Sequence, residues 1–357
     1  MALEYEHLVQ PSRPLAEEFS NNPDWHREIC GTMRMLGSLG ARLFQKTHLS
    51  SLGRPFRAWL GVGVAAVAVF AASGCGGASP TAPTPASPVT AVPTPPPAPK
   101  VVILSIDGLR ADAFVQADLP NLKALAARGA FSYSARTVRP SETLPAHASM
   151  LSGQDPANHQ LTYDWNAFLP EKGYIAVPTA LSVARAAGLR TVAVVGKAKL
   201  EHLAPSSAVE AFVLASRGDS DVANEAVVRV TAGFDLLFIH FPDVDLAGHA
   251  SGWMSPAYLA KLAEVDAAAG RVLAALPAHA TVILTADHGG KGTDHAADIP
   301  ENTTVPWVVA GPKVVRKGAM TSKVKVTDTA VTALWLLGLT LPGSCAGELI
   351  REPFTSQ

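Results

Sequence analysis

Long runs of hydrophobic residues alternate with amphipathic segments along the chain from Lys100 onward. Five of these runs are rich in β-branched residues and are typical of strands buried on both faces: residues 101–107, 191–197, 234–241, 281–288 and 305–312. Segments with the apolar spacing of helices lie between them, at residues 119–129, 178–188 and 255–276. This alternation predicts an α/β fold in which helices sandwich a doubly wound, mostly parallel sheet.

Polar side chains gather where three of the predicted strands end. They are three Asp and three His residues: Asp107, Asp245, His249, Asp287, His288 and His295. Ligands of parallel sheets bind just beyond the carboxyl ends of the strands, so we expect these side chains to converge there. Oxygen and imidazole ligands without thiolates suit Zn, Mn or Fe. Six ligands are too many for one tetrahedral ion, and they fit two divalent ions with three protein ligands each.

Thr143 stands at the predicted start of a helix, within the segment "RPSETLPAHASMLSG". Pro145 is typical of a first helical turn, and the apolar residues Met150 and Leu151 follow it. The backbone N–H groups and the dipole of a helix N-terminus favour an alkoxide and an incoming anion, which makes Thr143 a candidate nucleophile. The alternative is that Thr143 only caps the helix.

Residues 54–75 have the layout of a secretory signal. Arg54 and Arg57 precede an apolar run at residues 58–72, and small residues then lead to Cys75. The ending resembles a bacterial lipobox, which predicts that Cys75 is lipidated and that the rest of the chain is exported to the periplasm or cell surface. An uncleaved membrane anchor is the alternative, and either form would tether the protein to a membrane.

The segments on either side of this signal have no predicted core. Residues 1–53 have mixed charge and little periodicity; we interpret them as a gene-model extension, with the true start at Met33, Met35 or a later codon, or as a cytoplasmic tail. Residues 76–99 are rich in Pro, Thr, Ala and Ser and predict a semi-rigid linker. The remaining residues, 100–357, form the predicted catalytic domain.

Composition narrows the function further. The 357 residues carry 29 Lys+Arg and 30 Asp+Glu, a formal net charge of -1, and no basic cluster interleaved with aromatic residues, so we expect no nucleic-acid partner. The cysteines are Cys30, Cys75 and Cys345, and they predict no intramolecular disulfide framework. Composition does not indicate the oligomeric state.

Four motifs in this order resemble the alkaline phosphatase superfamily, in particular its nucleotide pyrophosphatase/phosphodiesterase branch with a threonine nucleophile. They are "ILSIDGLRADAF", "PSETLPAHASMLSG", "DVDLAGH" and "TADHGGKGTDH", and the resemblance runs from about Lys100 to Gly338. It implies an alkaline-phosphatase-like core and, because the chain has no long insertion, a small or absent cap.

The resemblance also implies the roles of the site residues. The metal site that carries the nucleophile would take Asp107, Thr143, Asp287 and His288, and the second site would take Asp245, His249 and His295. Two divalent ions, most typically zinc, are implied as cofactors. Thr143 would attack phosphorus, and water would then hydrolyse the phosphothreonine.

Further residues bear on the substrate. Lys197 and Lys199 lie two apart after a predicted strand, so both could point to one side of an extended segment. They are similar to a lysine pair that grips a dianion in related enzymes, which favours a phosphate monoester; the alternative is two solvated surface lysines. For the family's phosphate-binding asparagine we choose Asn166, although Asp164 stands nearer the ungapped position.

Other functions are alternatives to the hydrolysis of phosphate monoesters. A phosphodiesterase or nucleotide pyrophosphatase is the nearest rival, followed by a phosphonate hydrolase and by a non-catalytic, surface-tethered binding protein. The sequence "ETLPAHAS" does not match the C/S-x-P-x-R context of sulfatases, and the chain is too short for the inserted domain of a metal-dependent phosphoglycerate mutase. We expect His147 to support the Thr143 loop and His240 to have a packing or hydrogen-bonding role.

Overall fold

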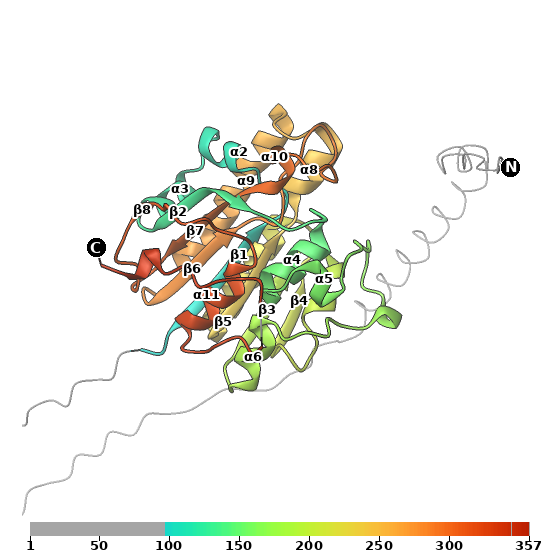
Figure 1. Ribbon diagram of the computed structural model, residues 1–357. Coiled ribbons are helices and arrows are strands. Elements are labelled where there is room, and N and C mark those ends of the chain that lie inside the picture. Colours follow the sequence, from blue (N-terminus) through green and yellow to red (C-terminus); the bar gives the residue numbers. More distant parts are fainter. Residues whose placement is uncertain (1–96, 344, 357) are drawn as a thin grey trace, which may run out of the picture. The chain divides into compact units, whose positions relative to one another are not determined.

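An eight-stranded sheet lies at the centre of residues 97–343 and 345–356, which are the residues that this computed structural model describes (Figure 1). The strand order is β4-β3-β5-β1-β6-β7-β2-β8. The strands are β1 (Lys100–Ile106), β2 (Ala130–Arg136), β3 (Thr191–Val195), β4 (Ala211–Leu214), β5 (Leu236–Phe241), β6 (Ala280–Thr285), β7 (Thr304–Ala310) and β8 (Gly318–Ala319). Strand β7 runs antiparallel to β6 and β2, whereas the other paired strands are parallel. The predicted mostly parallel sheet is therefore confirmed.

Helices flank this sheet in two groups. In chain order they are α2 (Ala111–Gln116), α3 (Pro120–Ala127), α4 (Thr143–Ser152), α5 (Pro156–His159), α6 (Ala180–Ala186), α7 (Asp219–Ala232), α8 (Asp243–Ser251), α9 (Pro256–Ala275), α10 (Pro300–Thr303) and α11 (Asp328–Leu336), with 3₁₀ turns η2 (Pro170–Lys172), η3 (Ala198–Leu203) and η4 (Glu352–Phe354). Helices α4, α6 and α11 pack against one another, and α9 packs against α3, α7 and α8 (Figure 1).

The interior of the sheet explains why the central strands were visible in the sequence. Residues 101–106 of β1 are completely buried, so both faces of this strand are covered. Each large apolar side chain buried in this way contributes about 1.5–3 kcal/mol to folding. The five predicted strands correspond to β1, β3, β5, β6 and β7, and the three predicted helices correspond to α3, α6 and α9.

The parallel strands also decide where the polar loops lie. Strands β3, β5, β1 and β6 are neighbours in the sheet and run in the same direction. Their carboxyl ends, at Val195, Phe241, Ile106 and Thr285, therefore share one edge. The loops and helix starts that follow these residues can meet there although they are far apart in the chain.

Several predictions fall outside the described residues. They are the extension or tail at residues 1–53, the signal at residues 54–75 with its lipidation site Cys75, and all but the last residues of the linker at 76–99. In the part of the chain that the structure describes, no helix is long and apolar enough to span a membrane. Cys345 is a free thiol.

Candidate active site and metal centre

Three buried side chains form what we call the inner group: Asp107, Asp287 and His288. Asp107 directly follows β1, and the other two lie just beyond β6. The Nε2 atom of His288 is 3.5 Å from Asp107 Oδ1 and 3.3 Å from Asp287 Oδ2. Asp287 Oδ1 accepts hydrogen bonds from the backbone N–H groups of Gly108 (3.1 Å) and His288 (2.9 Å). Asp287 Oδ2 is therefore the oxygen that faces His288 Nε2 in the inner group.

A second set, which we call the outer group, consists of Asp245, His249 and His295. The first two lie four residues apart in α8, hence on one face of that helix. His295 comes from the loop between β6 and α10. His249 Nε2 lies 3.4 Å from Asp245 Oδ1 and 3.2 Å from His295 Nε2. The side chain of His249 is 43% exposed, so this group is open to solvent.

The two groups are adjacent and meet at Asp245. Ligand atoms of Asp245, His249 and His295 lie within 4.8 Å of one another, and so do those of Asp107, Asp245 and His288. Six side chains from three strand ends thus surround one small volume, as the sequence predicted. Their arrangement has the form of two neighbouring cation sites.

In each of the three histidines, the hydrogen bond made by Nδ1 determines which ring nitrogen carries the proton. The Nδ1 atoms of His288, His249 and His295 lie 2.8, 2.9 and 2.7 Å from the carbonyl oxygens of Gly289, Thr293 and Ser141. A carbonyl oxygen only accepts, so Nδ1 carries the proton in all three rings and each Nε2 presents a bare lone pair. This is the tautomer that protein histidines adopt when they bind a metal through Nε2.

Unpaired atoms point to the same conclusion. Among the described residues, four buried atoms of these groups have no hydrogen-bond partner: Asp107 Oδ1, Asp245 Oδ1, Asp287 Oδ2 and His288 Nε2. Leaving a buried acceptor unpaired costs about 1–3 kcal/mol, and more if it is charged. The lone pairs of His249 and His295 also face each other at 3.2 Å. Divalent cations would satisfy all these acceptors, and the mixed N and O donors fit such ions.

Lys197 is the cation that faces the buried carboxylates directly. Its Nζ atom lies 2.7 Å from Asp107 Oδ2 and 2.6 Å from Asp245 Oδ2. Burial by itself lowers the pKa of Lys197, but these carboxylates raise it above its ordinary value. Burial raises the pKa of Asp107, but Lys197 and the hydrogen bond from His240 bring it well below its usual range. The pKa of Asp287 is raised well above its usual range by burial and by the charge of Asp107.

Thr143 is the first residue of α4 and is buried beside this cation. Its Oγ1 atom lies 3.3 Å from Lys197 Nζ. His147, one turn further along α4, contacts the carbonyl oxygen of Thr143 at 2.8 Å through Nδ1, and its Nε2 atom lies 2.9 Å from Ser105 Oγ. Because the carbonyl accepts, the ring is protonated on Nδ1 and Nε2 accepts from the serine hydroxyl. His147 thus supports the start of α4.

The candidate substrate residues line a cleft of about 640 Å³ that also contains Thr143 and the outer group. Lys197 directly precedes η3 and Lys199 lies within it. The prediction that both lysines lie on one extended segment is therefore wrong. Both lysines nevertheless line the cleft. The side chain of Lys199 is 8% exposed, which contradicts the alternative of two solvated surface lysines.

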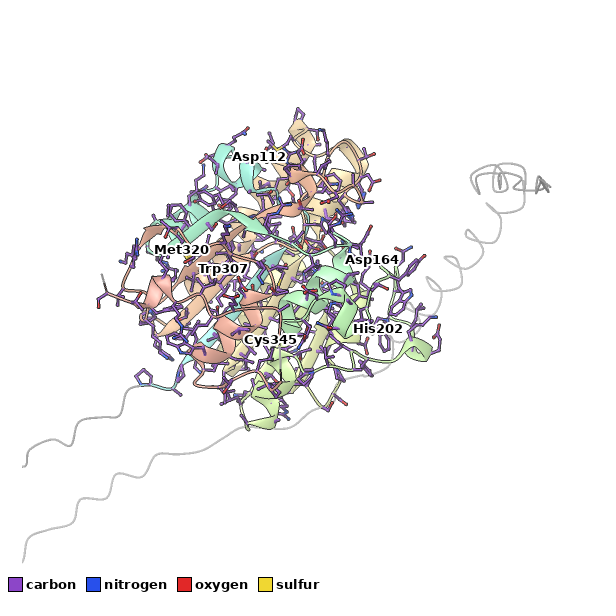
Figure 2. All side chains as sticks on the ribbon, in the orientation of Figure 1. Asp112, Asp164, His202, Trp307, Met320 and Cys345 are labelled. Carbon is purple, nitrogen blue, oxygen red and sulfur yellow. The ribbon has the colours of Figure 1, made fainter. Side chains whose placement is uncertain are left out.

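The inner position in this cleft belongs to Asp164. Asp164, labelled in Figure 2, lies on the loop between α5 and η2. Its Oδ1 atom accepts a hydrogen bond from the backbone N–H of Leu144 at 2.8 Å, and Oδ2 lies 2.7 Å from Lys199 Nζ. Asn166 is exposed and lines the cleft further out. Asp164, at nearly the ungapped position, is therefore the residue that contacts the start of α4, and the phosphate-binding role chosen for Asn166 stays a prediction.

His240 supports the inner group, a role that the sequence indicated only in general terms. Its Nε2 atom is 2.8 Å from Asp107 Oδ2, while the backbone N–H of Gly196 donates to its Nδ1 atom at 3.3 Å. The proton must therefore be on Nε2, which donates to the carboxylate. A histidine within the apolar strand "LLFIHF" was the available signal, because a completely buried polar side chain needs a partner.

Comparisons with known proteins agree with this geometry. Residues 101–308 match the model of the family described as type I phosphodiesterase / nucleotide pyrophosphatase. Among curated proteins, a 2,3-bisphosphoglycerate-independent phosphoglycerate mutase of Syntrophotalea carbinolica is 32% identical over 141 residues, 37% of this chain and 26% of the mutase. The catalytic subunit of human GPI ethanolamine phosphate transferase 2 is 28% identical over 275 residues, 70% of this chain and 27% of that protein. The chain spans about a quarter of the length of these relatives.

Solved structures show the same fold. Murine ectonucleotide pyrophosphatase / phosphodiesterase 5 matches with a TM-score of 0.62 and 16% identity, covering 72% of this chain and 100% of that chain. A 2-O GAG sulfatase matches with a TM-score of 0.61 and 18% identity, covering 72% and 74%. The phosphonate monoester hydrolase of Silicibacter pomeroyi matches with 0.56 and 16%, covering 71% and 76%. At these identities the likeness shows the fold alone.

Proposed function

Because the chain belongs to the type I phosphodiesterase / nucleotide pyrophosphatase family, within the alkaline phosphatase superfamily, we propose that it hydrolyses phosphate esters with Thr143 as the nucleophile and two divalent metal ions as cofactors. The observation that carries this proposal is the set of unpaired ligand atoms in the inner and outer groups. These atoms converge where Lys197 joins Thr143 to Asp107 and Asp245. Zinc is our first choice because the donors are imidazole nitrogens and carboxylate oxygens.

Asp107, Asp287 and His288 would hold one ion, and Asp245, His249 and His295 would hold the other. Bound divalent ions supply Lewis acidity, which makes the threonine hydroxyl and a water molecule nucleophilic near neutral pH. Each ligand histidine is held by a backbone carbonyl, so the residues are oriented before any ion arrives.

The reaction of the chain's own residues is a double displacement. The Thr143 oxygen forms a bond to phosphorus while the bond to the leaving alkoxide breaks; the hydroxyl proton goes to solvent, and the alkoxide takes a proton from water. Water then attacks phosphorus and loses a proton, the bond to Thr143 breaks, and the threonine oxygen takes up a proton in place of the one it gave to solvent. His147, bonded to the Thr143 carbonyl, keeps the nucleophile at the helix start throughout.

The charges in the cleft favour a phosphodiester as the substrate. A monoester preference requires Lys197 and Lys199 to be free to hold a dianion. In the structure Lys199 is paired with Asp164. Lys197 contacts Asp107 and Asp245, which are proposed metal ligands, so the preference for a diester rests on the pairing of Lys199. A diester carries one negative charge and needs no additional cation. Phosphomonoester hydrolysis is the second candidate, because Lys197 Nζ lies within 3.3 Å of Thr143 Oγ1.

The test compares two esters with the same leaving group. The full-length protein, loaded with zinc, is assayed with bis-p-nitrophenyl phosphate and with p-nitrophenyl phosphate, beside the variant Thr143→Ala. We expect the diester to have the higher kcat/KM, and we expect Thr143→Ala to lose at least about a thousandfold on both esters. Full activity of Thr143→Ala would refute the nucleophile, and absence of hydrolysis of either ester would refute the proposed function.

A further inference from the structure

The carboxylate of Asp164 lies against the start of the helix that carries the nucleophile. It accepts a hydrogen bond from the N–H of Leu144, the residue after Thr143. The next residue, Pro145, has no N–H, and the N–H of Ala146 already donates to the carbonyl of Glu142 at 2.9 Å. Asp164 therefore takes the donor that lies next to the nucleophile.

Lys199 completes this arrangement. Its Nζ atom is 2.7 Å from Asp164 Oδ2, and the two side chains are only 8% and 17% exposed. Asp164 and Lys199 should therefore stay paired, because separating them would leave two unpaired charges in a poorly solvated position. The cation that could have attracted an extra substrate charge is thus neutralised by the protein itself.

The number of charged oxygens distinguishes the two kinds of ester. A monoester dianion has three non-bridging oxygens that share two negative charges, whereas a diester has two such oxygens and one charge. A helix N-terminus ordinarily favours an anion, and here the chain's own carboxylate occupies that place. A third charged oxygen near Thr143 would face the Asp164 carboxylate and be repelled by it, whereas an uncharged ester oxygen would not be repelled.

We propose that Asp164 is a specificity-determining residue that disfavours dianionic phosphoryl groups, both monoesters and inorganic phosphate, relative to monoanionic diesters. The proposal rests on the proposed function for its substrates, and on the contacts of Asp164 for its selectivity. Asp164→Asn keeps the size of the side chain, removes its charge, and releases Lys199. The variant should accept the dianions that the natural protein disfavours.

The first experiment measures a ratio of activities in the full-length, zinc-loaded protein. Asp164→Asn should raise the ratio of kcat/KM for p-nitrophenyl phosphate to that for bis-p-nitrophenyl phosphate by at least about tenfold, because a unit charge within a few ångströms of the dianion is removed. Asp243→Asn is the matched control: it removes one charge from the same cleft without touching Leu144 or Lys199, and should change the ratio by less than about threefold.

Lys199→Met provides a second variant with the opposite expected sign. It leaves the charge of Asp164 uncompensated, so the same ratio should fall below that of the natural protein. An unchanged ratio in Asp164→Asn, or an equal change in Asp243→Asn, would overturn the proposal. The second of these outcomes would show a general effect of net charge in the cleft.

A binding measurement separates this proposal from the proposed function. Inorganic phosphate is titrated calorimetrically into the zinc-loaded natural protein, Asp164→Asn and Asp243→Asn. We expect Asp164→Asn alone to bind phosphate at least about tenfold more tightly. This result needs no turnover, so it stands even if neither ester is hydrolysed. Equal phosphate affinity in all three proteins would refute the role of Asp164.

Discussion

Two regions of this protein bury carboxylates in opposite ways. At the carboxyl edge of the sheet, Asp107, Asp245 and Asp287 each leave one oxygen without a hydrogen-bond partner among the described residues. Near the C-terminus, Glu352 accepts hydrogen bonds from the N–H and hydroxyl groups of both Thr321 and Ser322.

The difference separates a structural charge from a functional one. Protein donors satisfy Glu352 completely, so its contacts tie the C-terminal segment to the loop after β8 and require nothing else. Asp266 behaves similarly: it accepts from the backbone N–H groups of Asn121 and Leu122 at the start of α3. Among the carboxylates at the sheet edge, Asp287 has a pKa that burial and the charge of Asp107 raise well above its usual range, so its charged form is disfavoured until a cation binds. Such costs are typical of sites built for a ligand.

The largest expected effect comes from Asp287→Asn, which removes a charge from the inner group. Asparagine keeps the acceptor for the backbone N–H of Gly108, so the fold should persist. We expect kcat/KM to fall about a thousandfold, since a metal ligand contributes several kcal/mol to transition-state stabilisation. The chelator-stripped variant should melt at a higher temperature than the natural protein, because burial and the charge of Asp107 both raise the pKa of Asp287.

Activity assays, metal analysis by mass spectrometry and calorimetric melting with and without zinc check this prediction. A lower melting temperature in the metal-free variant would show that the sheet edge is not under electrostatic strain. The proposed contrast between a strained Asp287 and a fully hydrogen-bonded Glu352 would then be wrong, whatever the effect on activity.

A smaller effect is expected for His249→Ala in the outer group. The side chain is 43% exposed and contributes little to packing, so stability without metal should hardly change. We expect bound zinc to fall from two ions per chain to one and kcat/KM to fall on the order of a hundredfold. Metal content after gel filtration measures the first effect. Retention of two ions with full activity would remove His249 from the metal centre.

The smallest effect on activity is expected for Glu352→Gln. This variant should keep full activity and lose stability. Burial alone would raise the pKa of Glu352, but the hydrogen bonds from Ser322 and Thr321 lower it from 4.5 to about 2. A lowered folded-state pKa means that the stabilisation is present above pH 4.5 and is lost as the pH falls toward 2. The variant should lose about 1–2 kcal/mol of unfolding free energy at pH 7 and progressively less below pH 4.5.

Urea unfolding of both proteins at pH 7 and pH 3 tests this sign. A loss that stays constant between these pH values would mean that the charge of Glu352 is not what its neighbours stabilise. A loss of activity in the folded variant would contradict the separation of the two regions.

The sheet was predictable where packing is strongest. Strand β1 is buried on both faces, so nearly every position had to be apolar, and the run at residues 101–107 showed it. Strand β2, "AFSYSAR", mixes polar with apolar residues because several of its side chains are only partly covered, and β4 and β8 are four and two residues long. Helix α7 is similarly polar on its open side. These elements lack a pattern strong enough to predict.

The sequence by itself determined the α/β fold and the residue types of the candidate site, because strand ends are marked by the change from apolar to Asp and His. Only the tertiary structure decided which oxygen and nitrogen atoms remain unpaired, since that depends on backbone groups such as the Gly289 carbonyl and the Gly108 N–H. It also decided that Asp164, and not Asn166, meets the start of α4, and that both lysines are paired. Hydrogen bonds and charge pairs act over a few ångströms, and spacing along a chain does not specify such distances between segments.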